Sequence, residues 1–359
     1  MSSAKPSSTS ALWAHIRPFL ELSDRKRPWG FLVTVALSAG LPVVIATWLG
    51  QFTVGVAASC GGLASLYLRQ TPLSHRLVTM ALTTFGFCSS FLLCLLAGFS
   101  PVSISVALGF VAFWATFICR YFAVPAPGSF FFILVGCIAS AMPFDLSLAA
   151  ERTGILFFGC VGACVMTLTY SLIQLLRGFR AGIHPAEAPE RRVVAIVLEA
   201  TTIATFIAAS YLLALWLGFD KPYWAPISCA AILQGATFRM VWHRKVHRIV
   251  GTIIGMGLAW LIFSFNPGPW ILVTLIICLT FVIEILVTRN YGLAVIFITP
   301  LTIILAEGGS ASFEINSVIL LRLIDVIAGS SVGYLGGWLL HQRDLYDRLE
   351  QRLLRLRVK

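Results

Sequence analysis

The sequence predicts an all-α polytopic membrane protein of about 12 transmembrane helices, arranged as two parallel six-helix repeats. Hydrophobic residues make up 58% of the 359 residues and charged residues 11%, against roughly 25% charged residues in soluble domains. The mean hydropathy is +0.89. Arg152, at the start of one long apolar segment, recurs as Arg322, an offset of 170 residues. His75-Arg76 recurs as His247-Arg248 at nearly the same offset, 172 residues. Landmarks that repeat at one period indicate an internal repeat.

Apolar segments long enough to consider as spans fall evenly on the two sides of residues 177–195. A helix needs about 20 mostly apolar residues to cross the hydrocarbon core. The first six are predicted at 31–49, 52–68, 77–97, 101–119, 125–142 and 153–176, and the second six at 196–217, 223–238, 248–265, 269–287, 291–306 and 318–340. The weakest of them, 52–68, 125–142, 223–238 and 291–306, are short or interrupted by proline, which removes a helix hydrogen bond.

The basic residues indicate the orientation in the membrane. With both termini in the cytoplasm, all of the 26 Lys and Arg residues except Arg152, Lys221 and Arg322 fall on the cytoplasmic side, as the positive-inside rule requires. The anionic inner leaflet then explains the net charge of +11 without a nucleic-acid partner. The predicted organisation is a cytoplasmic N-terminal tail (1–30), repeat 1 (31–176), a cytoplasmic connector (177–195), repeat 2 (196–340) and a cytoplasmic basic tail (341–359).

The C-terminal tail is predicted to form an amphipathic helix, with leucines near one face and arginines on another. A helix lying on the inner leaflet and a dimerising helix are both compatible with this pattern. The nine cysteines all lie within predicted spans, so small apolar packing residues are the interpretation we favour over disulfides or a metal site.

The second half carries a series of motifs in a specific order. They are Tyr223-Trp224-Ala225 leading to Leu233-Gln234, then Arg248-Ile-Val-Gly251-Thr252-Ile-Ile-Gly255, then Tyr291 to Thr299-Pro300, then Arg322-Leu-Ile-Asp325-Val-Ile-Ala-Gly329. Together they resemble the fusaric acid resistance protein-like family, and more distantly the plant aluminium-activated malate channels. The resemblance implies a bacterial inner-membrane protein linked to efflux of aromatic carboxylic acids, in some members with a periplasmic adaptor protein. Larger relatives carry a soluble domain between the halves, which this chain replaces with a short connector.

Two arginines at span ends are candidate substrate-binding residues. Arg322 and Asp325 are three residues apart and can share one helical face, whereas the counterpart of Asp325 in the first half is Ile155. Arg152 therefore lacks a matching acid, and a carboxylate substrate could supply one through two parallel hydrogen bonds. The alternative is that both arginines extend to the outer interface. Trp224 and Gln234, on the eighth predicted span, are further candidates for substrate binding.

Acidic residues and small residues within the spans complete the candidates. Glu199, Glu284 and Asp325 could form structural ion pairs or carry a proton that couples efflux to the proton gradient. Small residues four apart let helices approach closely. This pattern predicts helix packing at Gly251, Gly255, Gly329 and Gly333, between the ninth and twelfth spans or across the repeat interface.

His243 and His247 have a spacing that can bind metal on a helix, but the surrounding arginines and lysine disfavour a cation. We expect a basic cytoplasmic loop there, and no metal site or cofactor. The chain shows no nucleophile–base or metal-ligand cluster, so we do not expect an enzyme.

The sequence is interpreted as an inner-membrane transporter that exports small organic anions, with aromatic specificity implied by the resemblance alone. A passive organic-anion channel and a non-transporting membrane scaffold are the alternatives. The expected partners are the lipid bilayer, a small anionic substrate, a periplasmic adaptor and further copies of the chain.

Overall fold

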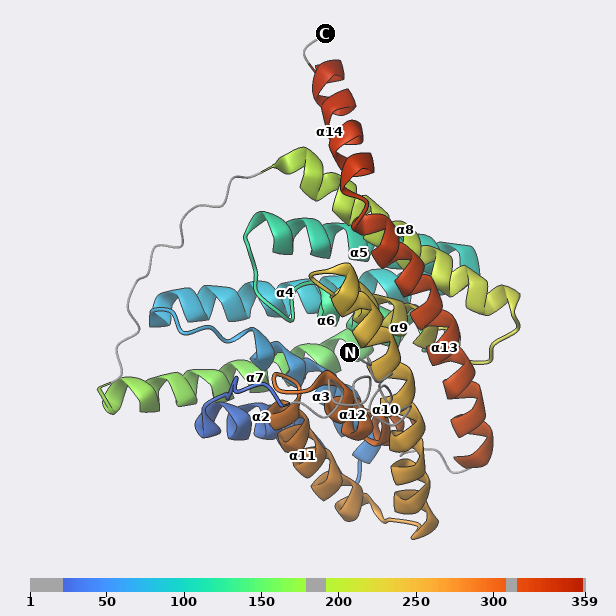
Figure 1. Ribbon diagram of the computed structural model, residues 1–359. Helices are drawn as coiled ribbons and strands as arrows, with labels where there is room; N and C mark the ends of the chain where they lie inside the picture. Colours follow the sequence, from blue (N-terminus) through green and yellow to red (C-terminus); the bar gives the residue numbers. More distant parts are fainter. Residues whose placement is uncertain (1–21, 179–191, 308–314, 358–359) are drawn as a thin grey trace, which may run out of the picture.

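The computed structural model describes residues 22–178, 192–307 and 315–357, and these residues form helices joined by short connections (Figure 1). In the first half the α-helices are α2 (Trp29–Trp48), α3 (Phe52–Gly62), α4 (Leu73–Leu96), α5 (Pro101–Tyr121), α6 (Phe130–Ser140) and α7 (Ala149–Leu176), with 3-10 helices η1 (Leu63–Tyr67) and η2 (Ala97–Phe99). In the second half they are α8 (Val193–Trp216), α9 (Trp224–Leu233), α10 (Phe238–Ser264), α11 (Pro269–Leu286), α12 (Tyr291–Glu307), α13 (Ile315–Leu340) and α14 (Arg343–Arg357).

Within the described residues, eight helices are long and apolar enough to cross a membrane: α2, α4, α5, α7, α8, α10, α11 and α13. Shorter apolar helices occupy the four segments predicted to be weak spans. The shortest, α6 with 11 residues and α9 with 10, are each about 15 Å long at 1.5 Å per residue, half of the roughly 30 Å hydrocarbon core. The all-helical membrane class is confirmed, and length alone assigns only eight of the predicted segments as spans.

Most helix ends predicted from the sequence lie within a few residues of the observed ends, but α10 begins ten residues earlier than expected. Its N-cap is Thr237, whose side chain accepts a hydrogen bond from the Met240 backbone N–H. This cap starts the helix before its apolar part, so the basic stretch that contains His243 and His247 is helical. The expectation of a loop there is wrong, because the charged residues suggested a loop while the capping threonine carried the stronger signal.

Two glycine contacts bring helices together in the same way in each half. A Cβ on Gly159 of α7 would meet the Ala58 carbonyl of α3, and a Cβ on Gly329 of α13 would meet the Ala225 carbonyl of α9 at 2.1 Å. Gly333, one turn further along α13, faces Cys229 in the same manner. These short α3 and α9 helices are therefore held directly against α7 and α13.

The other predicted packing glycines face a different neighbour. Cβ atoms on Gly251 and Gly255 of α10 would meet the backbone carbonyls of Gly292 and Ile296 of α12. The glycines of α10 and α13 thus approach α12 and α9 of the same half, rather than each other or the opposite repeat as the sequence pattern predicts.

The halves are joined by the packing of α2 on α11 and of α5 on α8. The C-terminal helix α14 projects beyond α8 (Figure 1) and contacts it through an ion pair between Arg192 and Glu350 and a hydrogen bond of 2.6 Å between the Thr202 and Tyr346 hydroxyls.

Replacing Gly329 with alanine should lower the thermal stability of the purified protein by the equivalent of about 1–3 kcal/mol, because the added methyl group forces α13 away from α9. Gly257→Ala in α10 is the control, since a Cβ there meets nothing within 4 Å. Thermal unfolding in detergent measures both. Equal midpoints for Gly329→Ala and Gly257→Ala would contradict the close packing.

Candidate anion-binding cavity

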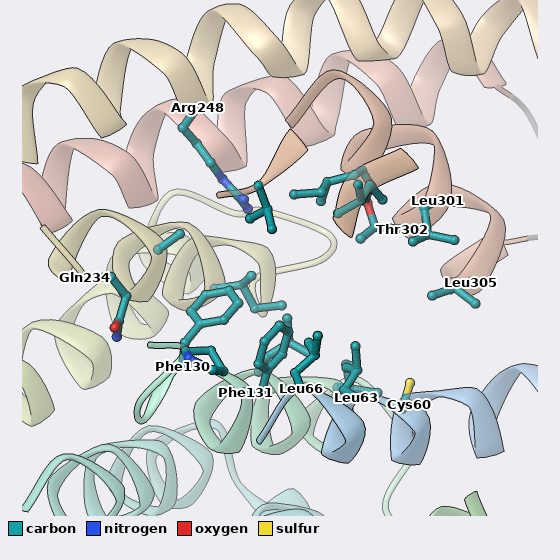
Figure 2. A pocket seen from close by; sticks show the side chains of 18 of the residues that line it. Cys60, Leu63, Leu66, Phe130, Phe131, Gln234, Arg248, Leu301, Thr302 and Leu305 are labelled. Atoms are coloured by element: carbon teal, nitrogen blue, oxygen red, sulfur yellow. Dashed lines mark hydrogen bonds between the residues drawn. The ribbon is translucent and has the colours of Figure 1, made fainter. Parts of the chain in front are cut away.

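A cavity of about 1120 Å³ lies between the two halves. The first half contributes residues of α3, η1 and α6, and the second half contributes α9, α10, α11 and α12 (Figure 2). Residues from Tyr291 to Ala306 of α12 line it, so it follows about 22 Å of that helix at 1.5 Å per residue. The short helices α6 and α9 thus end at a cavity inside the bundle, where polar backbone ends can be tolerated in a membrane.

One wall of the cavity is apolar and partly aromatic. Figure 2 shows Phe130 and Phe131 of α6 beside Leu63 and Leu66 of η1 on one side of the open space, with Leu301 and Leu305 of α12 on another. Such a wall favours the hydrocarbon or aromatic part of a ligand.

Arg248 of α10 supplies a positive charge opposite this wall. It is 6% exposed, and Figure 2 shows its side chain reaching into the cavity towards Phe130. Its Nη2 donates to the Ser228 hydroxyl of α9 at 3.3 Å, and its Nε has no hydrogen-bond partner. No ion pair among the described residues includes Arg248. A buried guanidinium without an acid costs several kcal/mol, and a carboxylate ligand would offset that cost.

The charge of the lining favours anions throughout. The described lining residues include six Lys or Arg side chains and two acidic ones: Arg25, Arg27, Lys221, Arg244, Arg248 and Arg289 against Asp220 and Glu284. A cavity lined by one sign of charge and low-dielectric walls concentrates ions of the opposite sign. At the Asp220–Lys221 end, outside the helices, burial lowers the pKa of Lys221, and the charge of Arg322 acts in the same direction.

Arg322 lies behind the cavity wall and does not line it. Its guanidinium carbon stands 3.7 Å from the centre of the Trp224 ring, and its Nη2 donates to the Thr302 hydroxyl. Trp224 and Thr302 both line the cavity. The structure therefore places Trp224 at the site directly and Arg322 next to it.

The other arginine predicted from the repeat lies apart from the cavity. Arg152 donates from Nη1 to the backbone carbonyl of Pro143 at 2.5 Å, and neither residue lines the cavity. No ion pair joins Arg322 to Asp325, although the spacing allows one; Asp325 is 2% exposed and its Oδ1 has no hydrogen-bond partner. The roles of Arg152 and Arg322 in substrate binding and of Asp325 in coupling stay predictions.

The remaining predicted polar residues take separate positions. Gln234 follows the last residue of α9 and lines the cavity (Figure 2). Glu284 also lines it and pairs with Arg27. Glu199 pairs with Arg120, with 2.6 Å between the charged atoms, and neither residue lines the cavity. The partners of these two acids lie far from them in the sequence, and local spacing cannot reveal such pairs.

The structure adds residues that the sequence did not select as a site. Arg248 was assigned to a cytoplasmic segment, yet it lies ten residues inside α10. Its position in the motif Arg248 to Gly255, one of those that carry the family resemblance, was the sequence signal that could have identified it. His243 and His247 line the cavity on the same helix. Within the described part of the chain, no group of three or more His, Cys, Asp or Glu residues could hold a metal ion.

The part of the chain that contributes most of the polar lining residues is similar to a known protein family. Residues 207–336 match the family described as fusaric acid resistance protein-like. This confirms the resemblance of the second half, and the match covers less than half of the chain. The fusaric acid resistance protein-like segment includes Trp224, Gln234, Arg248 and Thr302.

A curated relative is similar over a comparable length. The chain is 35% identical over 156 residues to the uncharacterized membrane protein YvaC of Bacillus subtilis (strain 168), a match that covers 44% of this chain and 25% of that protein. The chain thus spans about a quarter of the length of the curated relative it matches. No solved structure matches the chain.

The Arg27–Glu284 pair should stabilise the protein, because Arg27→Met would leave a buried carboxylate without its cation. We expect a loss of about 1–3 kcal/mol, below the value for a fully buried pair, since the Arg27 side chain is 25% exposed. The double variant Arg27→Met/Glu284→Gln should recover most of the loss. Thermal unfolding in detergent measures it, with exposed Lys26→Met as control. Additive losses in the double variant would show that the two side chains are not coupled.

Proposed function

We propose that the protein is a membrane transporter that exports small organic anions, including aromatic carboxylic acids. The single observation that supports this most strongly is the Arg248 guanidinium, buried in a large cavity without an acidic partner among the described residues. Ionisable residues inside a membrane are expensive and usually mark a pathway for substrate or ions. An anionic ligand supplies the charge that the surrounding helices do not.

The dimensions of the cavity suit a small amphiphilic acid. Its volume of about 1120 Å³ slightly exceeds the range of roughly 300–1,000 Å³ for ligand pockets, so a small acid fits inside it. A carboxylate at Arg248 would place the rest of the ligand against the wall formed by Phe130 and Phe131. The match to the fusaric acid resistance protein-like family supports the same class of substrate for residues 207–336.

The orientation follows from the basic residues. We place both termini in the cytoplasm of a bacterial cell, so that the cavity end at Arg25, Arg27, Arg244 and Arg289 faces the cytoplasm and the end at Lys221 faces the opposite side. Lining residues at both ends of α12 support a pathway along that helix.

The two-repeat organisation remains part of the proposal. It is supported by corresponding helix contacts: α3 with α7 and α9 with α13, α4 with α6 and α10 with α12. Each half would then contribute four long helices and two short ones, the short ones entering the membrane without a full-length span. Assembly with further copies or with a periplasmic adaptor, and the absence of enzymatic activity, stay predictions.

Transport should depend on Arg248. In proteoliposomes, Arg248→Met should reduce the apparent affinity for labelled hydroxybenzoate at least roughly tenfold, the loss of one charge-assisted interaction. Arg248→Lys should be intermediate, because it keeps the charge and loses the two-pronged geometry. Arg177→Gln, exposed and outside the cavity, is the control.

The same assay separates the alternatives. Flux that needs a pH gradient supports a coupled exporter, and flux that follows the membrane potential alone supports a passive channel. The absence of flux in correctly inserted protein would favour a non-transporting scaffold and overturn the proposal. Equal affinities for Arg248→Met and the wild type would remove Arg248 from the site.

A further inference from the structure

Arg322 and Trp224 form a close contact between a buried cation and an aromatic ring that lines the cavity. The guanidinium lies over the indole ring at 3.7 Å from its centre, within the range of a strong cation–π contact. Arg322 is only 5% exposed. One face of the Trp224 ring is therefore covered by a buried cation.

Arg322 also fixes the neighbouring wall. Its Nη2 donates to the Thr302 hydroxyl, which itself donates towards the backbone carbonyls of Ile298 and Thr299 at 2.9 Å. Both Trp224 and Thr302 line the cavity, whereas Arg322 does not. Arg322 thus holds two lining residues from two helices without reaching the ligand space itself.

Trp224 lines the cavity and is 7% exposed, with the centre of the Tyr223 ring 4.9 Å from its own, so a ligand meets the part of the ring that Arg322 and Tyr223 leave uncovered. A fixed indole is a stacking partner for another aromatic ring, and its preference depends on the orientation of its faces and edges. A cation on the covered face also draws electron density towards itself, which reduces the repulsion between the open part of the ring and an anionic ligand.

The position of Trp224 relative to the buried charge suits a ligand with a ring and a carboxylate. Arg248 donates to Ser228, four residues after Trp224 on α9. Four residues advance a helix by about 6 Å. A ring stacked on Trp224 and a carboxylate held at Arg248 would occupy neighbouring positions on one helix.

We propose that Trp224 is the specificity-determining residue of this cavity and that Arg322 is its positioning residue. Together they form a stacking platform that favours flat aromatic carboxylates over saturated ones of the same size and charge. This inference rests on the proposed transport of organic anions. It assigns the selectivity between aromatic and saturated anions to the indole ring of Trp224.

The test compares benzoate with cyclohexanecarboxylate, which have similar size and the same charge but differ in aromatic character. The measured quantity is the ratio of their KM values for flux into proteoliposomes. Trp224→Leu should lower the preference for benzoate roughly 2- to 12-fold, the range of one aromatic pair, and Trp224→Phe should keep part of it. Arg322→Gln should change the ratio in the same direction as Trp224→Leu, and Arg322→Lys should preserve more of it.

Arg177→Gln is the control, because Arg177 is exposed at the end of α7 and lies outside the cavity, so the ratio should stay unchanged. A merely structural role for Arg322 would reduce transport of both acids equally. If Arg322→Gln fails to reach the membrane, Arg322→Lys and the two Trp224 variants still decide the result.

An unchanged ratio in Trp224→Leu would overturn the platform, even with normal transport of both acids by the wild type. An altered ratio in Trp224→Leu with an unchanged ratio in both Arg322 variants would overturn the positioning role. Wild-type protein that transports neither acid would instead contradict the proposed function itself, so the two failures are distinguishable.

Discussion

The buried charge of Arg248 is the constraint on which the rest of the account depends. Its guanidinium is held by a hydroxyl and by the walls of the cavity, with no ion pair in the described regions of the chain. A bilayer interior makes such an arrangement costly. The structure accommodates it by surrounding Arg248 with a large cavity that water or an anion can enter. The short helices, the excess of basic lining residues and the aromatic wall all have a common explanation if that occupant is an organic anion.

Corresponding arginines have different partners in the two halves, and this difference assigns the anion-binding site to the arginines of the second half. Arg76, the counterpart of Arg248, donates to the Thr71 carbonyl, the Ser171 hydroxyl and the Gln174 side chain at 2.7 to 3.1 Å. Its hydrogen-bonding capacity is therefore largely used within the first half. Arg152 binds a backbone carbonyl, whereas its counterpart Arg322 supports Trp224. In the second half Arg248 reaches the cavity and Arg322 supports one of its lining residues, while η1 and α6 of the first half supply the apolar wall opposite Arg248.

Much of the fold could be predicted from the sequence, because long apolar segments leave a bilayer protein few alternatives. Proline and short length correctly marked α6 and α9 as unusual segments, though they could not show that both end at a cavity. The start of α10 was missed, since its basic residues resemble a loop and only Thr237 marks the cap. The site was predicted less well. Trp224 and Gln234 line the cavity, but the partners of Glu199 and Glu284 come from distant parts of the chain, and no local spacing encodes such pairs. Arg248 was overlooked because a helix that starts earlier places it deeper in the bundle.

A structure of the protein bound to iodobenzoate, whose iodine can be located by anomalous scattering, would show most directly whether the cavity holds an organic anion. We expect iodine within the cavity between Trp224 and the Phe130 wall, with the carboxylate at the Arg248 guanidinium. Iodine found only at lipid-facing surfaces, with the cavity free of the acid at saturating concentration, would contradict this expectation.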